Sequence, residues 1–131
     1  RVAVKVIEAA AGRRDREAEL LARVRHPCIV PLLEAFEAPG QDGKPAVHIV
    51  MEYLPGNLHD RIGGAPLDPE TLRCYTLQLL RALAHLHGMQ VCHRDVKPEN
   101  VLVDGCVLKL GDFGSAKTLD GSGPSGSYIC S

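Results

Sequence analysis

Three separated segments of the chain carry side chains of the types that chemistry on a phosphate group requires. Lys5 lies within an apolar run, Asp95 and Asn100 are five residues apart, and Asp112 follows Asn100 by twelve residues. Carboxylate and amide oxygens are the ligands that Mg²⁺ prefers, and a lysine ammonium group is a compact positive charge. Taken singly, such a lysine is usually a solvated charge and such an aspartate often belongs to an ordinary turn. The argument therefore depends on the order and spacing of these residues.

The order and spacing resemble those of the protein kinase catalytic domain. His93-Arg94-Asp95 followed by Asn100 resembles the kinase catalytic loop, and Asp112-Phe113-Gly114 resembles the D-F-G motif. Upstream, Val2-Ala3-Val4-Lys5 resembles the strand that carries the phosphate-contacting lysine. Glu17, on a predicted helix, is then the natural partner of that lysine. Because these motifs follow one another in the expected order, a coincidence is improbable.

The resemblance implies a role for each residue in transferring the γ-phosphate of ATP, a reaction that depends on positioning and charge neutralisation. Lys5 would hold the α- and β-phosphates, and Glu17 would position Lys5 through an ion pair. Asp112 and Asn100 would ligate Mg²⁺. Asp95 would accept the proton of the substrate hydroxyl and orient its oxygen for in-line attack.

Lys97 gives a further indication of substrate class. It follows Asp95 by two residues, and from there it could reach the transferring phosphate. The resemblance implies a serine/threonine kinase, since tyrosine kinases usually differ at this point. His93 is structural in kinases, so we assign it no chemistry.

The resemblance also implies an adenine-binding slot around residues 50–55, which would form the hinge of the kinase. Met51 would be the gatekeeper of the slot, although it would be an ordinary core residue in any case. The residues that would surround adenine are Ala3 and Leu102 on its two faces, Met51, and the backbone of Glu52 and Leu54.

At a finer level the chain looks like the glycogen synthase kinase 3 (shaggy) family. The segments 91–95, 108–117 and 127–131 carry this resemblance, together with the short interval from Lys5 to Glu17. Gly111 departs from it, because a cysteine is more usual there, and Asp104-Gly105 makes a tighter hairpin than usual. Neither departure affects a catalytic residue.

This finer resemblance implies two regulatory features. Arg16, Arg94 and Lys117 correspond to a basic pocket for a phosphate already present on the substrate, and guanidinium and ammonium groups suit a phosphate dianion. Such a kinase would prefer primed serine/threonine substrates. Tyr128 corresponds to the activation-loop tyrosine that the family autophosphorylates. Unrelated surface charges and simple packing of Tyr128 remain the alternatives.

The pattern of apolar residues predicts an α+β fold. Strands are predicted over 1–7, 29–36, 47–54, 101–103 and 107–110, and helices over 15–24 and from Asp68 to Gly88. On the second helix the predicted core stripe comprises Leu72, Tyr75, Leu79, Leu83 and Leu86. We interpret 1–131 as a two-lobe kinase fold truncated at both ends, with residues 1–54 in the upper lobe, 55–131 in the lower lobe, and ATP in the cleft between them.

Composition excludes several other classes. The chain has 131 residues, and its 15 basic residues nearly balance 16 acidic ones, so no nucleic-acid partner is expected. No apolar run is long enough to cross a membrane. The five cysteines form no CxxC pair, which disfavours a zinc site or a disulfide framework and favours reduced thiols in the cytoplasm or also the nucleus. Protein substrates are the expected partners, with scaffold proteins as further ones.

Two other hypotheses stay open. A pseudokinase would bind partners without catalysis, but the presence of Lys5, Glu17, Asp95, Asn100 and Asp112 argues against it. Alternatively, the chain is an inactive fragment of a longer kinase, with ATP and Mg²⁺ used only by the full-length parent.

Overall fold

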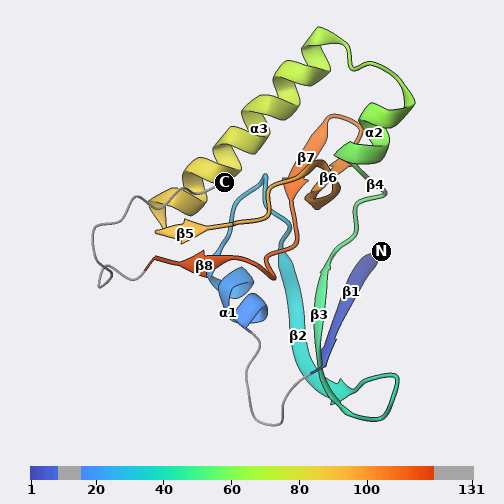
Figure 1. Ribbon diagram of the computed structural model, residues 1–131, viewed down its shortest axis with the longest axis vertical. Coiled ribbons are helices and arrows are strands. Elements are labelled where there is room, and N and C mark those ends of the chain that lie inside the picture. The colour runs from blue at the N-terminus through green and yellow to red at the C-terminus, as the bar shows by residue number, and fades with distance from the viewer. Residues whose placement is uncertain (9–15, 120–131) are drawn as a thin grey trace. The chain divides into compact units, whose positions relative to one another are not determined.

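The computed structural model describes residues 1–8 and 16–119, which divide into two compact units. The first unit contains Arg1–Arg25 and Val30–Tyr53, and the second contains His26–Ile29 and the chain from Leu54 onward. Figure 1 labels the helices and strands of both units. Mixed helix and sheet are present, as the sequence predicted, and each unit is described separately below.

The first unit is built on a three-stranded antiparallel sheet. Its strands are β1 (Val2–Glu8), β2 (Leu32–Pro39) and β3 (Pro45–Glu52), in the order β1-β3-β2. The central strand is the most buried, and Ile49 in it is fully inaccessible to solvent. In β1 the odd-numbered residues are half-buried while the even-numbered ones are exposed, which is the period-two pattern of a strand with one covered face.

Helix α1 (Arg16–Arg23) supplies the second layer of this unit. Leu20, Leu21 and the following Val24 are buried. Glu17 is buried as well, at only 4% exposed, although it is an acidic residue. Its burial is possible because a lysine from β1 pairs with the carboxylate, an arrangement that helical periodicity cannot reveal.

The second unit contains the helices α2 (Leu58–Gly64) and α3 (Pro69–Gly88). Helix α3 begins as predicted: the carboxylate of Asp68 accepts hydrogen bonds from the backbone N–H groups of Glu70 and Thr71. Helix α2 was not predicted. It begins at Asn57, whose side-chain oxygen accepts from the backbone N–H of Asp60 at 2.8 Å.

The core face of α3 differs in part from the predicted stripe. Tyr75, Ala82 and Leu86 are buried, whereas Leu72 is 54% exposed and lies outside the core. The Tyr75 hydroxyl donates to the backbone oxygen of Gly105 at 2.6 Å. This bond fixes which face of α3 contacts the hairpin that contains Gly105. Leu72 lies one turn nearer the start of the helix and continues the apolar spacing, but it lies outside this contact.

A small sheet packs beside α3. The predicted hairpin is formed by β6 (Val101–Asp104) and β7 (Val107–Leu110), and the short β4 (Gly56–Asn57) pairs with β6 on the other side. Gly105 in the hairpin turn has φ +55°, which glycine adopts without steric cost. Two further short strands, β5 (Val91–Cys92) and β8 (Lys117–Thr118), pair with each other and were not predicted.

The predicted strand over 29–36 starts too early. Strand β2 begins at Leu32, and Ile29 instead forms a parallel bridge with Leu110 of the second unit. The backbone N–H of Leu110 donates to the oxygen of Cys28 at 2.9 Å. Pro31 separates the two pairings, since proline has no N–H to donate.

The cysteines correct one expectation. Cys28, Cys74 and Cys106 have free thiols, but Cys92 is disulfide-bonded, so the prediction that all thiols are reduced is wrong for Cys92. A search of the described helices finds none with the length and apolar character needed to span a membrane.

Candidate active site

The first cluster joins Lys5 of β1 to Glu17 of α1. Lys5 Nζ lies 2.7 Å from Glu17 Oε2, and the lysine side chain is 35% exposed while the glutamate is 4% exposed. Antiparallel pairing with β3 places Lys5 opposite Ile49, so the sheet fixes where the ammonium group lies. The charge-assisted bond compensates the buried carboxylate. Lys5 thus retains exposed surface with which it could meet a further anion.

The second cluster joins Asp95, Lys97 and Asn100 in the second unit. Lys97 Nζ lies 2.9 Å from Asp95 Oδ2. The amide nitrogen of Asn100 donates to Asp95 twice, to its backbone oxygen at 2.8 Å and to Oδ2 at 2.9 Å. Asn100 is buried and ends the short 3₁₀ helix η1 (Pro98–Asn100). Both polar neighbours therefore hold the same carboxylate oxygen.

These contacts keep Asp95 ionised. The hydrogen bond from Lys97 is the main cause that lowers the pKa of Asp95, and the hydrogen bond from Asn100 lowers it further, while desolvation opposes them. In return, the hydrogen bond and charge of Asp95 raise the pKa of Lys97. The side chain of Asp95 is 32% exposed, so the carboxylate can be reached from solvent.

His93 anchors the backbone beside Asp95, a role that sequence patterns did not specify. The backbone N–H of Asp95 donates to His93 Nδ1 at 3.4 Å, and His93 Nε2 lies 2.8 Å from the backbone oxygen of Gly111. If Nδ1 accepts, the proton resides on Nε2, which donates to Gly111. The ring also meets Phe113 edge-on, with centroids 4.8 Å apart. His93 is therefore a positioning residue that connects the segments of Asp95 and Asp112.

Two backbone positions near this cluster are strained. Arg94 has φ +68° and Asp112 has φ +49°. Positive φ is uncommon for residues other than glycine, and such strain often occurs at functional sites. Next to Asp112, an added Cβ at Gly111 would lie 3.2 Å from Leu102 Cδ1. Glycine at position 111, where the resemblance leads one to expect cysteine, thus leaves space that the side chain of Leu102 occupies.

Asn100 and Asp112 suit a magnesium ion by their chemistry. The amide nitrogen of Asn100 donates to Asp95, so the amide oxygen of Asn100 points away from Asp95. Asp112 is exposed. No group of three or more His, Cys, Asp or Glu side chains that could hold a metal occurs among the described residues. Mg²⁺ bound with a nucleotide needs only one or two protein ligands, since phosphates and water supply the others. The residues present therefore fit a metal that arrives with a nucleotide.

The residues predicted to contact adenine are divided between the units. In the first, Ala3 of β1 lies directly opposite Met51 of β3, and Glu52 follows Met51 opposite Val2. In the second, Leu54 is buried and Leu102 of β6 is half-buried. Cross-strand pairing therefore brings Ala3 and Met51 together within the first unit.

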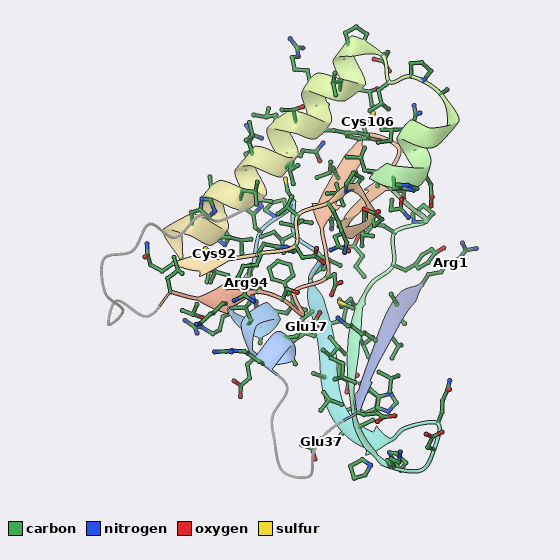
Figure 2. All side chains as sticks on the ribbon, in the orientation of Figure 1. Arg1, Glu17, Glu37, Cys92, Arg94 and Cys106 are labelled. Carbon is green, nitrogen blue, oxygen red and sulfur yellow. The ribbon has the colours of Figure 1, made fainter. Side chains whose placement is uncertain are left out.

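The predicted phosphate-binding residues are likewise divided. Arg16 is the first residue of α1 in the first unit, and it is exposed. In the second unit Lys117 pairs with Cys92 across β5 and β8, and Arg94 follows β5 closely (Figure 2). Both side chains are exposed, as a binding site for an external phosphate requires. Tyr128 lies outside the described residues.

Comparison with known proteins agrees with this geometry. The family model described as a protein kinase domain matches residues 1–131. The chain is 43% identical to protein kinase MCK1 of Saccharomyces cerevisiae, over 98% of this chain and 36% of that protein. It is 40% identical to glycogen synthase kinase 3 of Trypanosoma brucei brucei, over 99% of this chain and 41% of that protein.

A third relative is GLH-binding kinase 1 of Caenorhabditis elegans, with 41% identity over 98% of this chain and 36% of that protein. The chain thus spans roughly two fifths or less of the length of these relatives. The resemblance to kinases of the glycogen synthase kinase 3 type is confirmed as a similarity over nearly the whole chain. Since the family model covers every residue, the chain belongs to the protein kinase family.

Proposed function

We propose that the full-length protein is a serine/threonine protein kinase that transfers the γ-phosphate of ATP to serine or threonine in other proteins. The observation that carries the proposal is the cluster at Asp95, in which Lys97 and Asn100 both hold one carboxylate oxygen. Membership of the protein kinase family supports it independently.

The cluster suits the acceptor side of the reaction. Asp95 stays ionised at neutral pH, so it can accept a hydrogen bond from a substrate hydroxyl and orient the oxygen toward the phosphorus. Its carboxylate receives the hydroxyl proton as the new P–O bond forms and the bond between the γ-phosphorus and the ADP leaving group breaks. Lys97 lies beside Asp95, where its ammonium group can neutralise charge on the transferring phosphoryl group.

ATP and Mg²⁺ are the cofactors that we propose. Lys5, held by Glu17, would bind the nucleotide phosphates, and Asn100 and Asp112 would ligate the metal. Bound Mg²⁺ would neutralise negative charge on the phosphates during transfer. The adenine ring would contact the surface that Ala3 and Met51 share, together with the backbone of Glu52 and Leu54 and the side chain of Leu102.

We further propose a preference for primed substrates, by similarity to glycogen synthase kinase 3. Arg16, Arg94 and Lys117 would bind the priming phosphate, and Tyr128 would be autophosphorylated. The exposure of the three basic side chains supports the first part of this proposal. Protein substrates are the expected partners, with scaffold proteins as further ones.

Phosphate transfer from labelled ATP by the full-length protein tests the proposal. The acceptors are three matched peptides with serine, threonine or tyrosine as the acceptor residue, and a fourth in which the serine peptide already carries a phosphoserine. We expect transfer to serine and threonine, and faster transfer to the primed peptide. Absence of transfer to every peptide would favour the pseudokinase hypothesis. Equal rates for the primed and unprimed peptides would exclude the priming pocket but would leave the proposed kinase activity standing.

A further inference from the structure

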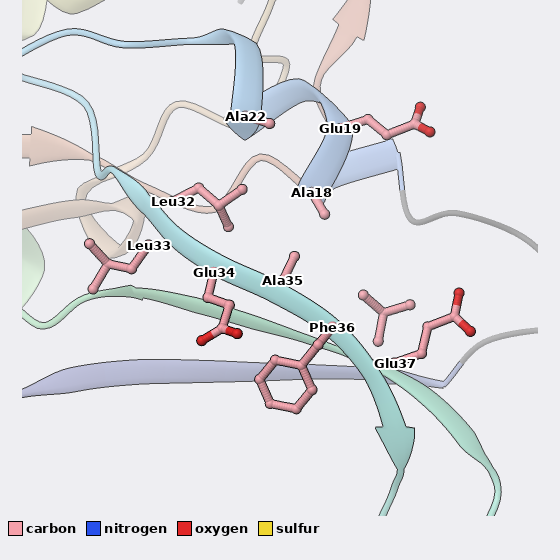
Figure 3. A pocket seen from close by; sticks show the side chains of 10 residues that line it. Ala18, Glu19, Ala22, Leu32, Leu33, Glu34, Ala35, Phe36 and Glu37 are labelled. Atoms are coloured by element: carbon pink, nitrogen blue, oxygen red, sulfur yellow. The ribbon is translucent and has the colours of Figure 1, made fainter.

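A groove of about 520 Å³ lies in the first unit, between α1 and β2 (Figure 3). It is lined by every residue from 32 to 37 of β2, by Ala18, Glu19 and Ala22 of α1, and by Val47 of the central strand β3. Successive side chains of a strand point to opposite faces of its sheet. Residues from both faces of β2 therefore line the groove, so it reaches the outer edge of the strand as well as the sheet face that carries Val47.

Strand β2 has a free edge within the described part of the chain. The sheet order is β1-β3-β2, so β2 pairs with β3 on one side and with no other described strand. The backbone N–H and C=O groups on the outer edge of a strand can pair with an added strand. Pro31 and Pro39 bound this edge, and no proline interrupts it between them. The interval is long enough for a short extended peptide.

The side chains along the groove are acidic and apolar. Glu19, Glu34 and Glu37 line it, and none of the described residues that line it is a lysine or an arginine. All three glutamates are exposed. Carboxylates distributed along a free strand edge would attract a basic segment and repel an acidic one. Such a surface also disfavours nucleic acid, whose phosphates are negative.

Small residues provide the space in the groove. Ala18 and Ala22 are one helical turn apart and so share a face of α1. Figure 3 shows Ala18 and Ala35 pointing toward one another across the groove, while Glu34 points to the other side of β2. An added strand would therefore place alternate side chains beside the alanines and beside Glu34. Apolar residues suit the first position and basic residues the second.

We propose that the outer edge of β2 is a docking site for an extended segment of a partner protein in which lysine or arginine alternates with apolar residues. The segment would pair with the backbone of β2 from Leu32 to Ala38. Its basic side chains would meet Glu34, and its apolar side chains would enter the space beside Ala18 and Ala22, on the face of β2 that also carries Glu37.

The test measures binding of a fluorescein-labelled peptide, Lys-Val-Lys-Val-Lys-Val-Lys, to the full-length protein by fluorescence anisotropy. We expect saturable binding that weakens severalfold when the salt concentration rises from about 0.05 to 0.5 M, since exposed charges are screened. A matched peptide with glutamate in place of lysine should not bind. A third peptide, N-methylated at alternate positions on the pairing edge, should bind at least about tenfold more weakly, because it cannot form the backbone ladder.

Two protein variants locate the site. The double variant Glu34→Lys/Glu37→Lys should weaken binding by about tenfold or more, since each substitution replaces attraction by repulsion. Ala22→Phe should weaken it as well, by filling the groove. Asp104→Lys is the matched control, because Asp104 is an exposed acid of β6 that does not line the groove, and it should leave affinity unchanged. Equal melting temperatures of all variants verify that they are folded.

Three results would overturn the proposal. The first is absence of peptide binding to the wild-type protein, as expected if another segment of its own chain covers the edge or if the glutamates serve only to prevent aggregation. The second is binding that neither groove variant weakens. The third is self-association in sedimentation analysis that the double variant abolishes, which would assign the edge to a second copy of the protein.

Discussion

The two polar clusters of this chain are held in different ways. Lys5 and Glu17 are twelve residues apart, on a strand and a helix, and they meet only because α1 packs on the sheet. Asp95, Lys97 and Asn100 lie within five residues of each other, and a short turn with hydrogen bonds to its own backbone brings them together. The first cluster therefore depends on tertiary packing, whereas the second is largely local.

Burial differs between the clusters as well. Glu17 is 4% exposed, so its charge must be compensated inside the unit, while the side chains of Asp95 and Lys97 are 32% and 48% exposed. Exposed ion pairs contribute little to stability, whereas breaking a buried pair is costly. We therefore expect substitutions in the first cluster to affect stability as well as nucleotide binding, and those in the second to affect mainly chemistry.

The largest effect expected from this comparison is that of Asn100→Ala on catalysis. The substitution removes both hydrogen bonds to Asp95 and a proposed metal ligand. Phosphate transfer by the full-length protein should fall by about 10²-fold or more, as loss of a positioned polar group in a closed site does. Steady-state kinetics measures the fall. A melting temperature within a few degrees of the wild type would show that the slower transfer does not result from unfolding. An unchanged transfer rate would contradict the role of Asn100 in holding Asp95.

Substitution of Lys5 should lower stability in addition to weakening nucleotide binding. Lys5→Met leaves the buried carboxylate of Glu17 without its cation, and we expect a loss of about 2–3 kcal/mol, less than for a fully buried pair because Lys5 is partly exposed. Glu17→Gln should cost less, since the amide oxygen can still accept from Lys5. Thermal unfolding of the full-length variants measures which of the two substitutions lowers stability more. The double variant Lys5→Met/Glu17→Leu should recover part of the loss, and a double variant less stable than Lys5→Met would contradict the explanation.

A smaller effect is expected on the titration of Asp95. Lys97→Met removes the main cause of the lowered pKa, so the pKa of Asp95 should rise toward the ordinary aspartate value of about 4. Because the folded pKa lies below the unfolded one, the contacts of Asp95 stabilise the fold above about pH 4 and are lost as the pH falls through the folded pKa. Carboxylate chemical shifts in NMR follow this titration. Asp42→Asn, in the first unit, serves as an acid control, and identical Asp95 titrations in wild type and Lys97→Met would exclude the ion pair.

The smallest effect is expected at Gly111, beside Asp112. In Gly111→Ala the new Cβ would lie 3.2 Å from Cδ1 of Leu102, the far end of a flexible side chain that can move by a few tenths of an ångström. We expect a destabilisation below about 1 kcal/mol and nearly normal activity. Thermal unfolding and kinetics of the variant check both. A severe loss of activity with normal stability would mean that the Asp112 segment tolerates less movement than its exposure suggests.

The sequence predicted the features that local rules control. The start of α3 at Asp68 and the turn at Gly105 follow from capping and turn chemistry within a few residues. The catalytic-loop segment was recognised for the same reason, because Asp95, Lys97 and Asn100 are close in sequence.

The pairing of Lys5 with Glu17 was predicted from the kinase resemblance, but other features that require distant partners were missed. The burial of Glu17 depends on Lys5, and the position of His93 depends on the backbone of Gly111, eighteen residues away. Leu72 continues the apolar spacing of α3 but is 54% exposed. Strands β5 and β8 have two residues each, too few to form a periodic pattern.

The central claim, that Asp95 serves phosphate transfer, is tested most directly by comparing turnover and nucleotide affinity in Asp95→Asn of the full-length protein. Asparagine keeps the size of the side chain but cannot accept the hydroxyl proton as the carboxylate does. We expect phosphate transfer to fall by about 10²–10⁴-fold, while affinity for Mg²⁺-ATP measured by calorimetry changes less than about threefold. Turnover close to that of the wild type would contradict the account.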